Sequence, residues 1–168
     1  QVASQDQEAE GSQLTASLNA VAETLRGVTI VPLKRGFAKP YYSAVPVSPV
    51  LITEDEVATS LSSDKYLISK VSHYLEAILG RDFRVNTKPG TAIFSLDATD
   101  KRTGVGSELV NEGFGVNQAV HLLARCLHWE SELVCIEEPE IHLHPQAVRA
   151  LAAAFVRMAQ KEKKRFVI

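Results

Sequence analysis

Two adjacent carboxylates stand at the end of an apolar run in the last third of the sequence. The segment 133–145 reads LVCIEEPEIHLHP, so Glu137 and Glu138 follow four apolar residues directly, and His142 and His144 come shortly after. Taking two like charges out of water beside a core is costly, and such a pair usually holds something positive. The segment therefore predicts a cation site.

The elements around these acids predict where the site lies. Residues 133–136 form an unbroken apolar run, typical of a buried strand, and Pro145 suits the first turn of the Ala-rich helix that follows. Another apolar strand begins in the segment 165–168. A strand, a helix and a strand at this spacing predict a right-handed crossover in a parallel sheet. Ligands of such sheets bind outside the carboxyl ends of the strands, which is where the two acids would stand.

A hydrophobic strand that ends in two acids is also the Walker B arrangement of nucleotide hydrolases. In that arrangement one acid holds magnesium, usually through water, and the next polarises the attacking water. The simpler alternative is a pair of solvated acids that cap the strand end or face lysines.

Glycines at the start of a helix form a second candidate site. The segment 112–118 reads EGFGVNQ, and the helix that it opens carries apolar residues on one face. Glycines at a helix start let backbone N–H groups and the positive end of the helix approach a phosphate closely. The alternative is a plain loop in which Gly113 and Gly115 serve only to turn the chain.

Together these motifs resemble a known family. The run 133–145 looks like the Walker B motif and D-loop of ABC-type ATPases, in the branch of the chromosome-maintenance and recombination ATPases, the overcoming-lysogenization-defect (OLD) nucleases and many bacterial AAA-type ATPases. The segment 112–118 is similar to the degenerate signature motif of that branch. The resemblance is tight over 105–168 and loose over 28–104. It implies an α/β fold, a partial P-loop NTPase with a parallel sheet core, a helical subdomain and a β-hairpin.

The resemblance also implies a role for each residue of the two motifs. Glu137 would be the acid on the magnesium side, and Glu138 would be the general base that orients water. The D-loop, which crosses to the partner subunit, would contain His142 and His144. The signature loop would meet the nucleotide of the other protomer in trans through Gly113, Gly115 and Asn117.

Two parts of a complete ATP site are missing from this sequence. No lysine stands in a G-x-x-x-x-G-K-[ST] motif, and the histidine that normally follows the next strand is absent because the sequence ends at Ile168. We therefore expect a fragment of a longer ATPase that is poorly active or inactive alone. The parent would use ATP and Mg²⁺ in a head-to-tail homodimer to drive a conformational change, by analogy in DNA processing or phage defence.

Two other function classes remain open. Glu137, Glu138, His142 and His144 could ligate a transition metal in a metal-dependent hydrolase, since carboxylate and imidazole suit such ions. In the simpler interpretation His144 caps the following helix. The chain could also be a non-enzymatic interaction module, kept after its ATP-binding loop was lost.

Basic residues offer only local candidates for DNA contact. The net charge of −2 gives no general attraction to nucleic acid. The cluster 161–165 suits a solvated helix end, and the segment 34–42, with aromatic residues between its cations, is the better candidate.

Composition limits the setting of the protein. A length of 168 residues with 45% hydrophobic content suits one globular unit, and no apolar run approaches the roughly 20 residues that span a bilayer. Cys126 and Cys135 lie in apolar segments, which predicts buried, reduced thiols in a cytoplasmic protein rather than a disulfide.

Three regions are expected along the chain. Residues 1–12 are polar and acidic and predict a disordered lead or linker. Residues 13–104 predict a helical and hairpin subdomain, with a capping box at 53–56 and a hairpin turn around Pro89. Residues 105–168 predict the signature helix and the strand-helix-strand core.

Overall fold

The computed structural model describes residues 2–168, and their side chains from Gln13 onward. In chain order the elements are α1 (Val2–Arg26), β1 (Val28–Val31), β2 (Tyr42–Ser43), α2 (Glu54–Ser63), α3 (Lys65–Leu79), β3 (Arg81–Thr87), β4 (Ile93–Asp100), β5 (Gly106–Glu108), η1 (Leu109–Asn111), α4 (Phe114–Leu127), β6 (Leu133–Ile136), α5 (Pro145–Lys161) and β7 (Arg165–Val167).

A parallel sheet of three strands carries the acid pair. Its order is β1-β6-β7, with Val31 opposite Ile136 and Val134 opposite Phe166. The parallel sheet predicted from the apolar runs is therefore confirmed. β1 belongs to the range 13–104, which the sequence predicts as a separate subdomain, yet it pairs directly with β6.

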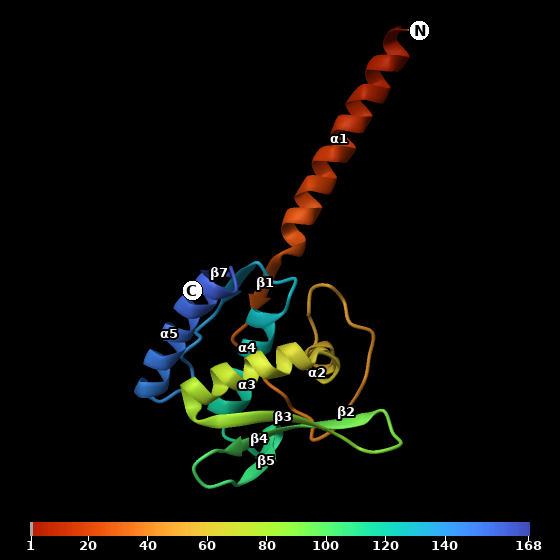
Figure 1. The fold of residues 1–168 in the computed structure, drawn as a ribbon. Helices are drawn as coiled ribbons and strands as arrows, with labels where there is room; N and C mark the ends of the chain where they lie inside the picture. Colours follow the sequence, from red (N-terminus) through yellow and green to blue (C-terminus); the bar gives the residue numbers. More distant parts are fainter. Residues whose placement is uncertain (1) are drawn as a thin grey trace.

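A second, antiparallel sheet contains the predicted hairpin. β3 and β4 pair from Arg81 opposite Asp100 to Thr87 opposite Phe94, and β2 and β5 extend the sheet. The turn between β3 and β4 places Gly90 at a φ of 75°, a conformation that glycine adopts without steric cost. In Figure 1 this sheet lies below α3, on the side of the molecule away from α1.

Local capping signals fix the helical pair between the sheets. Thr53 and Glu56 form the predicted capping box at the start of α2. Burial alone would raise the pKa of Glu56, but hydrogen bonds from Ser48, Thr53 and Ile52 outweigh it and lower the pKa to about 2. The capping box therefore fixes where α2 begins, directly after the loop that precedes Thr53.

The helix α4 is the centre of the core. Every residue from Ala119 to Leu127 is buried, and α4 packs against α3 and β1. A helix that is buried on all sides must satisfy its own polar side chains inside the protein, which matters for the site below.

The first helix differs from what the sequence predicts. α1 begins at Val2, so it includes residues 2–12, which the sequence predicts as a disordered lead; Gln1 lies outside the described residues. The apolar residues of its second half are about 60% exposed, namely Leu14, Leu18, Val21 and Leu25. In Figure 1 the helix projects from the body with no element beside it. No helix within residues 2–168 has the length and apolar character to span a membrane.

Candidate functional site

The acid pair lies at the carboxyl end of β6, in the middle strand of the parallel sheet. The Glu137 N–H donates to Val31 O at 3.1 Å, which extends the pairing of β6 with β1 by one residue. One carboxylate oxygen of Glu137 accepts the Leu33 N–H at 2.9 Å. Both acidic side chains are exposed. The sheet therefore presents two solvent-facing carboxylates at the edge where ligands of parallel sheets bind.

Arg35 fixes the backbone beneath both acids. Its Nη1 donates to Glu137 O at 2.7 Å and its Nη2 to Glu138 O at 2.8 Å. The backbone of Glu138 has a φ of 40°, a conformation that costs energy for any residue except glycine. A planar guanidinium bonded to two successive carbonyls opposes relaxation of that turn, so Arg35 holds the backbone of both acids in place.

The glycine loop contacts the segment that follows the acids. A Cβ on Gly115 would lie 2.7 Å from His142 O, closer than non-bonded atoms approach, so this position requires glycine. Gly113, by contrast, has open space around its Cα. Phe114 is 75% exposed, and its ring centroid lies 5.5 Å from that of His142. The two predicted motifs are thus brought together, with Gly113 and Phe114 facing outward.

Asn117 is turned into the protein. Its Oδ1 accepts the Phe37 N–H at 2.7 Å, while its Nδ2 donates to Phe37 O at 2.8 Å and to Leu109 O at 2.9 Å. A Cβ on Gly36 would come within 2.7 Å of the same Oδ1. Asn117 therefore joins α4 to the loop after β1 and to η1, and its amide is occupied by these bonds.

The histidines do not form the alternative transition-metal site. His144 is the N-cap of α5, where its Nδ1 accepts the Gln146 N–H at 3.3 Å, and the His142 ring packs on Phe114. Within residues 13–168, no group of three His, Cys, Asp or Glu side chains could hold a metal ion. The transition-metal hypothesis is therefore wrong, because the turn after Glu138 separates its ligands among a cap, a ring contact and the acid pair.

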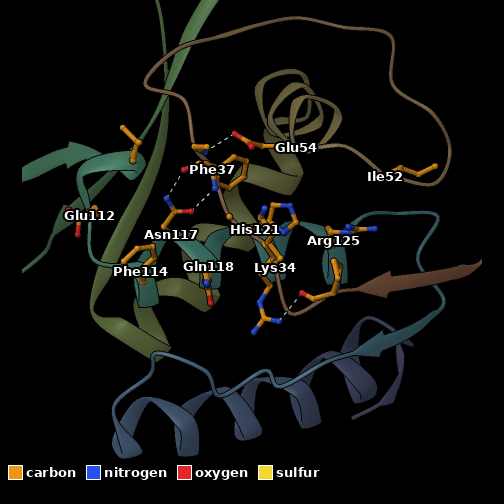
Figure 2. A pocket seen from close by; sticks show the side chains of 15 residues that line it. Lys34, Phe37, Ile52, Glu54, Glu112, Phe114, Asn117, Gln118, His121 and Arg125 are labelled. Carbon is orange, nitrogen blue, oxygen red and sulfur yellow. Dashed lines mark hydrogen bonds between the residues drawn. The ribbon is translucent and has the colours of Figure 1, made fainter.

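Sequence reasoning missed a set of buried polar residues on α4. His121 is 5% exposed and Arg125 is 6% exposed, and the sequence motifs assigned a role to neither. Burial, together with the charges of Arg125 and Arg35, lowers the pKa of His121 to about 3. Both side chains line a cavity of about 630 Å³ next to the glycine loop, shown in Figure 2. Their spacing of four residues inside an apolar helix was the signal that could have found them.

The cysteines and the basic cluster depart partly from expectation. Cys126 is a free, fully buried thiol, and burial raises its pKa to about 12, whereas Cys135 is free but only partly buried.

Lys164, predicted as a solvated lysine, is buried and donates to His128 O at 2.7 Å and to Ser131 O at 2.5 Å. Burial lowers the pKa of this ammonium group. Lys164 thus holds the turn between α4 and β6 and is not available to nucleic acid.

The other candidate for DNA contact is also largely engaged. In the segment 34–42, Phe37 and Tyr42 are buried, and Lys39 is paired with Asp55 at 2.7 Å. Buried rings cannot stack on bases, whereas Tyr41 and Lys34 of the same segment are exposed and remain candidates for nucleic-acid contact.

Comparison with known proteins agrees with this architecture. Residues 51–168 match the family model of the AAA ATPase domain. No curated protein matches the chain in sequence. Among solved structures, the fold is similar to the crystal structure of the Smc head domain with an extended coiled coil, bound to the C-terminal domain of ScpA, from Pyrococcus furiosus. The TM-score is 0.50 at 10% sequence identity, and the match covers 67% of this chain and 30% of that one. This chain thus corresponds to less than a third of that structure's length.

Proposed function

Because the chain belongs to the AAA ATPase domain family, we propose that its acid pair and glycine loop form part of an ATP-hydrolysing site. The observation that carries the proposal is the contact of Gly115 with His142 O, which joins the glycine loop to the loop of the acids. Two carboxylates and an exposed helix N-terminus at one edge are suited to magnesium and phosphate respectively.

The two exposed acids are suited to a magnesium ion. Mg²⁺ in nucleotide sites takes one or two carboxylates, keeps several waters and completes its shell with phosphate oxygens. One oxygen of Glu137 is already bonded to the Leu33 N–H, which orients the other toward solvent as a ligand. Glu138 is then the acid that positions water, with its backbone held by Arg35. When bound, the ion neutralises charge on the phosphates.

The phosphate cradle must come from elsewhere, since the sequence holds no G-x-x-x-x-G-K-[ST] motif. We propose that the parent protein supplies it, and that two protomers combine head to tail so that Gly113 and Phe114 of one approach the nucleotide of the other. The open space around Gly113 supports this role, because backbone N–H groups there can approach a ligand closely. Coupling to DNA processing or phage defence is proposed on the family resemblance alone.

A single pair of substitutions tests the proposal in the complete protein. Glu138→Gln should retain ATP binding but lower the rate of hydrolysis about 10²- to 10⁴-fold, the usual loss for a general base. Glu140→Gln is the matched control, because Glu140 is an exposed acid on the same loop. Normal turnover in Glu138→Gln, or an equal loss in Glu140→Gln, would remove Glu138 from this role. A complete protein without any ATP turnover would instead favour the interaction module.

A further inference from the structure

The cavity beside α4 is separate from the acid pair. Its walls are the loop after β1, the residues around the start of α2, the glycine loop and one face of α4. Neither Glu137 nor Glu138 lines it. In Figure 2, His121 and Asn117 lie on the side of α4 that faces Phe37 and Glu54, whereas Gln118 points the other way. A volume of about 630 Å³ lies within the range of small-molecule sites.

Buried polar atoms without partners gather around this cavity. Five buried side-chain atoms of residues 13–168 lack a hydrogen-bond partner, and four of them belong to residues that line the cavity: Arg35 Nε, Gln118 Oε1, His121 Nδ1 and Arg125 Nε. Buried polar groups are nearly always bonded, because leaving one unpaired costs about 1–3 kcal/mol. Each of the four atoms is itself closed off from the cavity, so a ligand reaches it only if the surrounding side chains shift, and their concentration in one wall marks where such a shift would relieve this cost.

The charge of the cavity identifies the partner as an anion. Arg125 donates to Leu51 O at 2.5 Å, and within the described side chains neither Arg125 nor Arg35 has a carboxylate at ion-pair distance. Burial lowers the pKa of both arginines, which reflects the cost of holding these charges away from water. Arg125 is buried and Arg35 is half-buried, and the carboxylates that act on them, those of Glu56 and of Glu137, Glu138 and Glu140, do so from beyond ion-pair distance. Such guanidinium groups favour binding of negative charge.

The carboxylates that line the same cavity do not supply this charge. Glu54 accepts hydrogen bonds from Ala38 N–H at 2.7 Å and from the Tyr42 hydroxyl. Glu112 accepts from the Ser107 hydroxyl at 2.7 Å. Both acids are thus bonded to other parts of the wall, and neither forms an ion pair with Arg35 or Arg125.

We propose that this cavity binds a small oxyanion, a phosphate ester or a carboxylate, through the guanidinium groups of Arg35 and Arg125. The buried, neutral imidazole of His121 and the amide of Gln118 complete the polar wall, and Phe37 provides an apolar surface. The exposed side chains of Lys34, Ile52 and Phe114 form the rim through which a ligand enters. Because Phe114 and Asn117 belong to the glycine loop, a bound ligand would contact that loop, and any effect of the ligand on ATP hydrolysis rests on the proposed function.

Calorimetric titration of the whole chain tests the proposal. Inorganic phosphate, pyrophosphate and citrate are added without ATP or divalent cations, so that the outcome does not depend on the proposed ATP site. We expect a Kd of about 1 mM or tighter for at least one of them. Tighter binding of pyrophosphate would identify a phosphate ester as the ligand class, and tighter binding of citrate a carboxylate.

Variants distinguish binding of an anion in this cavity from general electrostatic attraction of anions to the protein. Arg125→Met should weaken binding about tenfold or more, as expected for loss of a charge-assisted hydrogen bond. Arg125→Lys, which keeps the charge and can still reach Leu51 O, should bind with intermediate affinity and serves if the Met variant does not fold. Lys39→Met removes an exposed cation that does not line the cavity and should bind normally. Two outcomes would overturn the proposal. One is that no anion binds, which would indicate a hydrated cavity only; the other is that Lys39→Met weakens binding as much as Arg125→Met does.

Discussion

Replacing Asn117 with alanine separates two roles for this residue that predict opposite results. The family resemblance makes Asn117 a contact to a nucleotide in trans, whereas its three hydrogen bonds to Phe37 and Leu109 make it a structural tie. The first role predicts a loss of nucleotide affinity at unchanged stability. The second predicts a loss of stability in the isolated chain, where no nucleotide is present.

The size of the stability loss follows from the bonds that disappear. Each buried hydrogen bond contributes about 1 kcal/mol net, and alanine would leave one N–H and two carbonyls without partners. The loss is therefore about 3 kcal/mol in the free energy of unfolding. For a chain of this size that corresponds to a fall in Tm of roughly 6–12 °C.

Urea unfolding followed by far-UV circular dichroism measures this loss directly. Asn111→Ala is the matched control, because Asn111 is exposed and its amide bonds only to the Glu108 carboxylate, so its loss should change stability by less than about 0.5 kcal/mol. A change below about 1 kcal/mol in Asn117→Ala, together with weaker nucleotide binding in the complete protein, would refute the structural interpretation.

Two further predictions concern the glycine loop and the start of α2. Gly115→Ala should lower the free energy of unfolding by about 1–3 kcal/mol, because its Cβ must displace the backbone of His142. Gly113→Ser should leave the stability unchanged or raise it slightly, since Gly113 has open space around it and serine is a good helix N-cap. Urea unfolding measures both effects. Burial would raise the pKa of Glu56, but hydrogen bonds lower it from 4.5 to about 2, so its contribution to stability is present above pH 4.5 and lost as the pH falls toward 2. Unfolding titrations across this range should show a shallower fall for Glu56→Gln, and identical slopes would contradict the shift.

Local sequence patterns predicted the elements that carry the site. The run 133–136 predicted a buried strand, and the acids do follow it at the carboxyl end of a parallel sheet. The capping box at Thr53 and the proline at the start of α5 are signals contained within a few residues, and both correspond to helix ends in the structure. Such features are predictable because their physical causes lie within one turn or one strand of the residues themselves.

Contacts between distant segments were not predictable in this way. Arg35 reaches the carbonyls of Glu137 and Glu138 across about one hundred residues of chain, and nothing near Arg35 in the sequence indicates that partner. The burial of Lys164 has the same origin, because its acceptors, His128 O and Ser131 O, belong to a turn in another part of the chain. Charged residues near a helix end predict a solvated surface only when no distant carbonyl is brought against them.

Arg35 gives the acid pair and the cavity a shared element. Its two Nη groups hold the carbonyls of Glu137 and Glu138, while its Nε–H is buried without a partner at the cavity. A guanidinium is rigid and planar, so a shift of one nitrogen toward an anion must move the others. The backbone of Glu138, at a φ of 40°, is held against relaxation by that same group. An oxyanion bound to Arg35 would therefore change the strain beneath Glu138, which links the proposed cavity to the acid pair through one side chain.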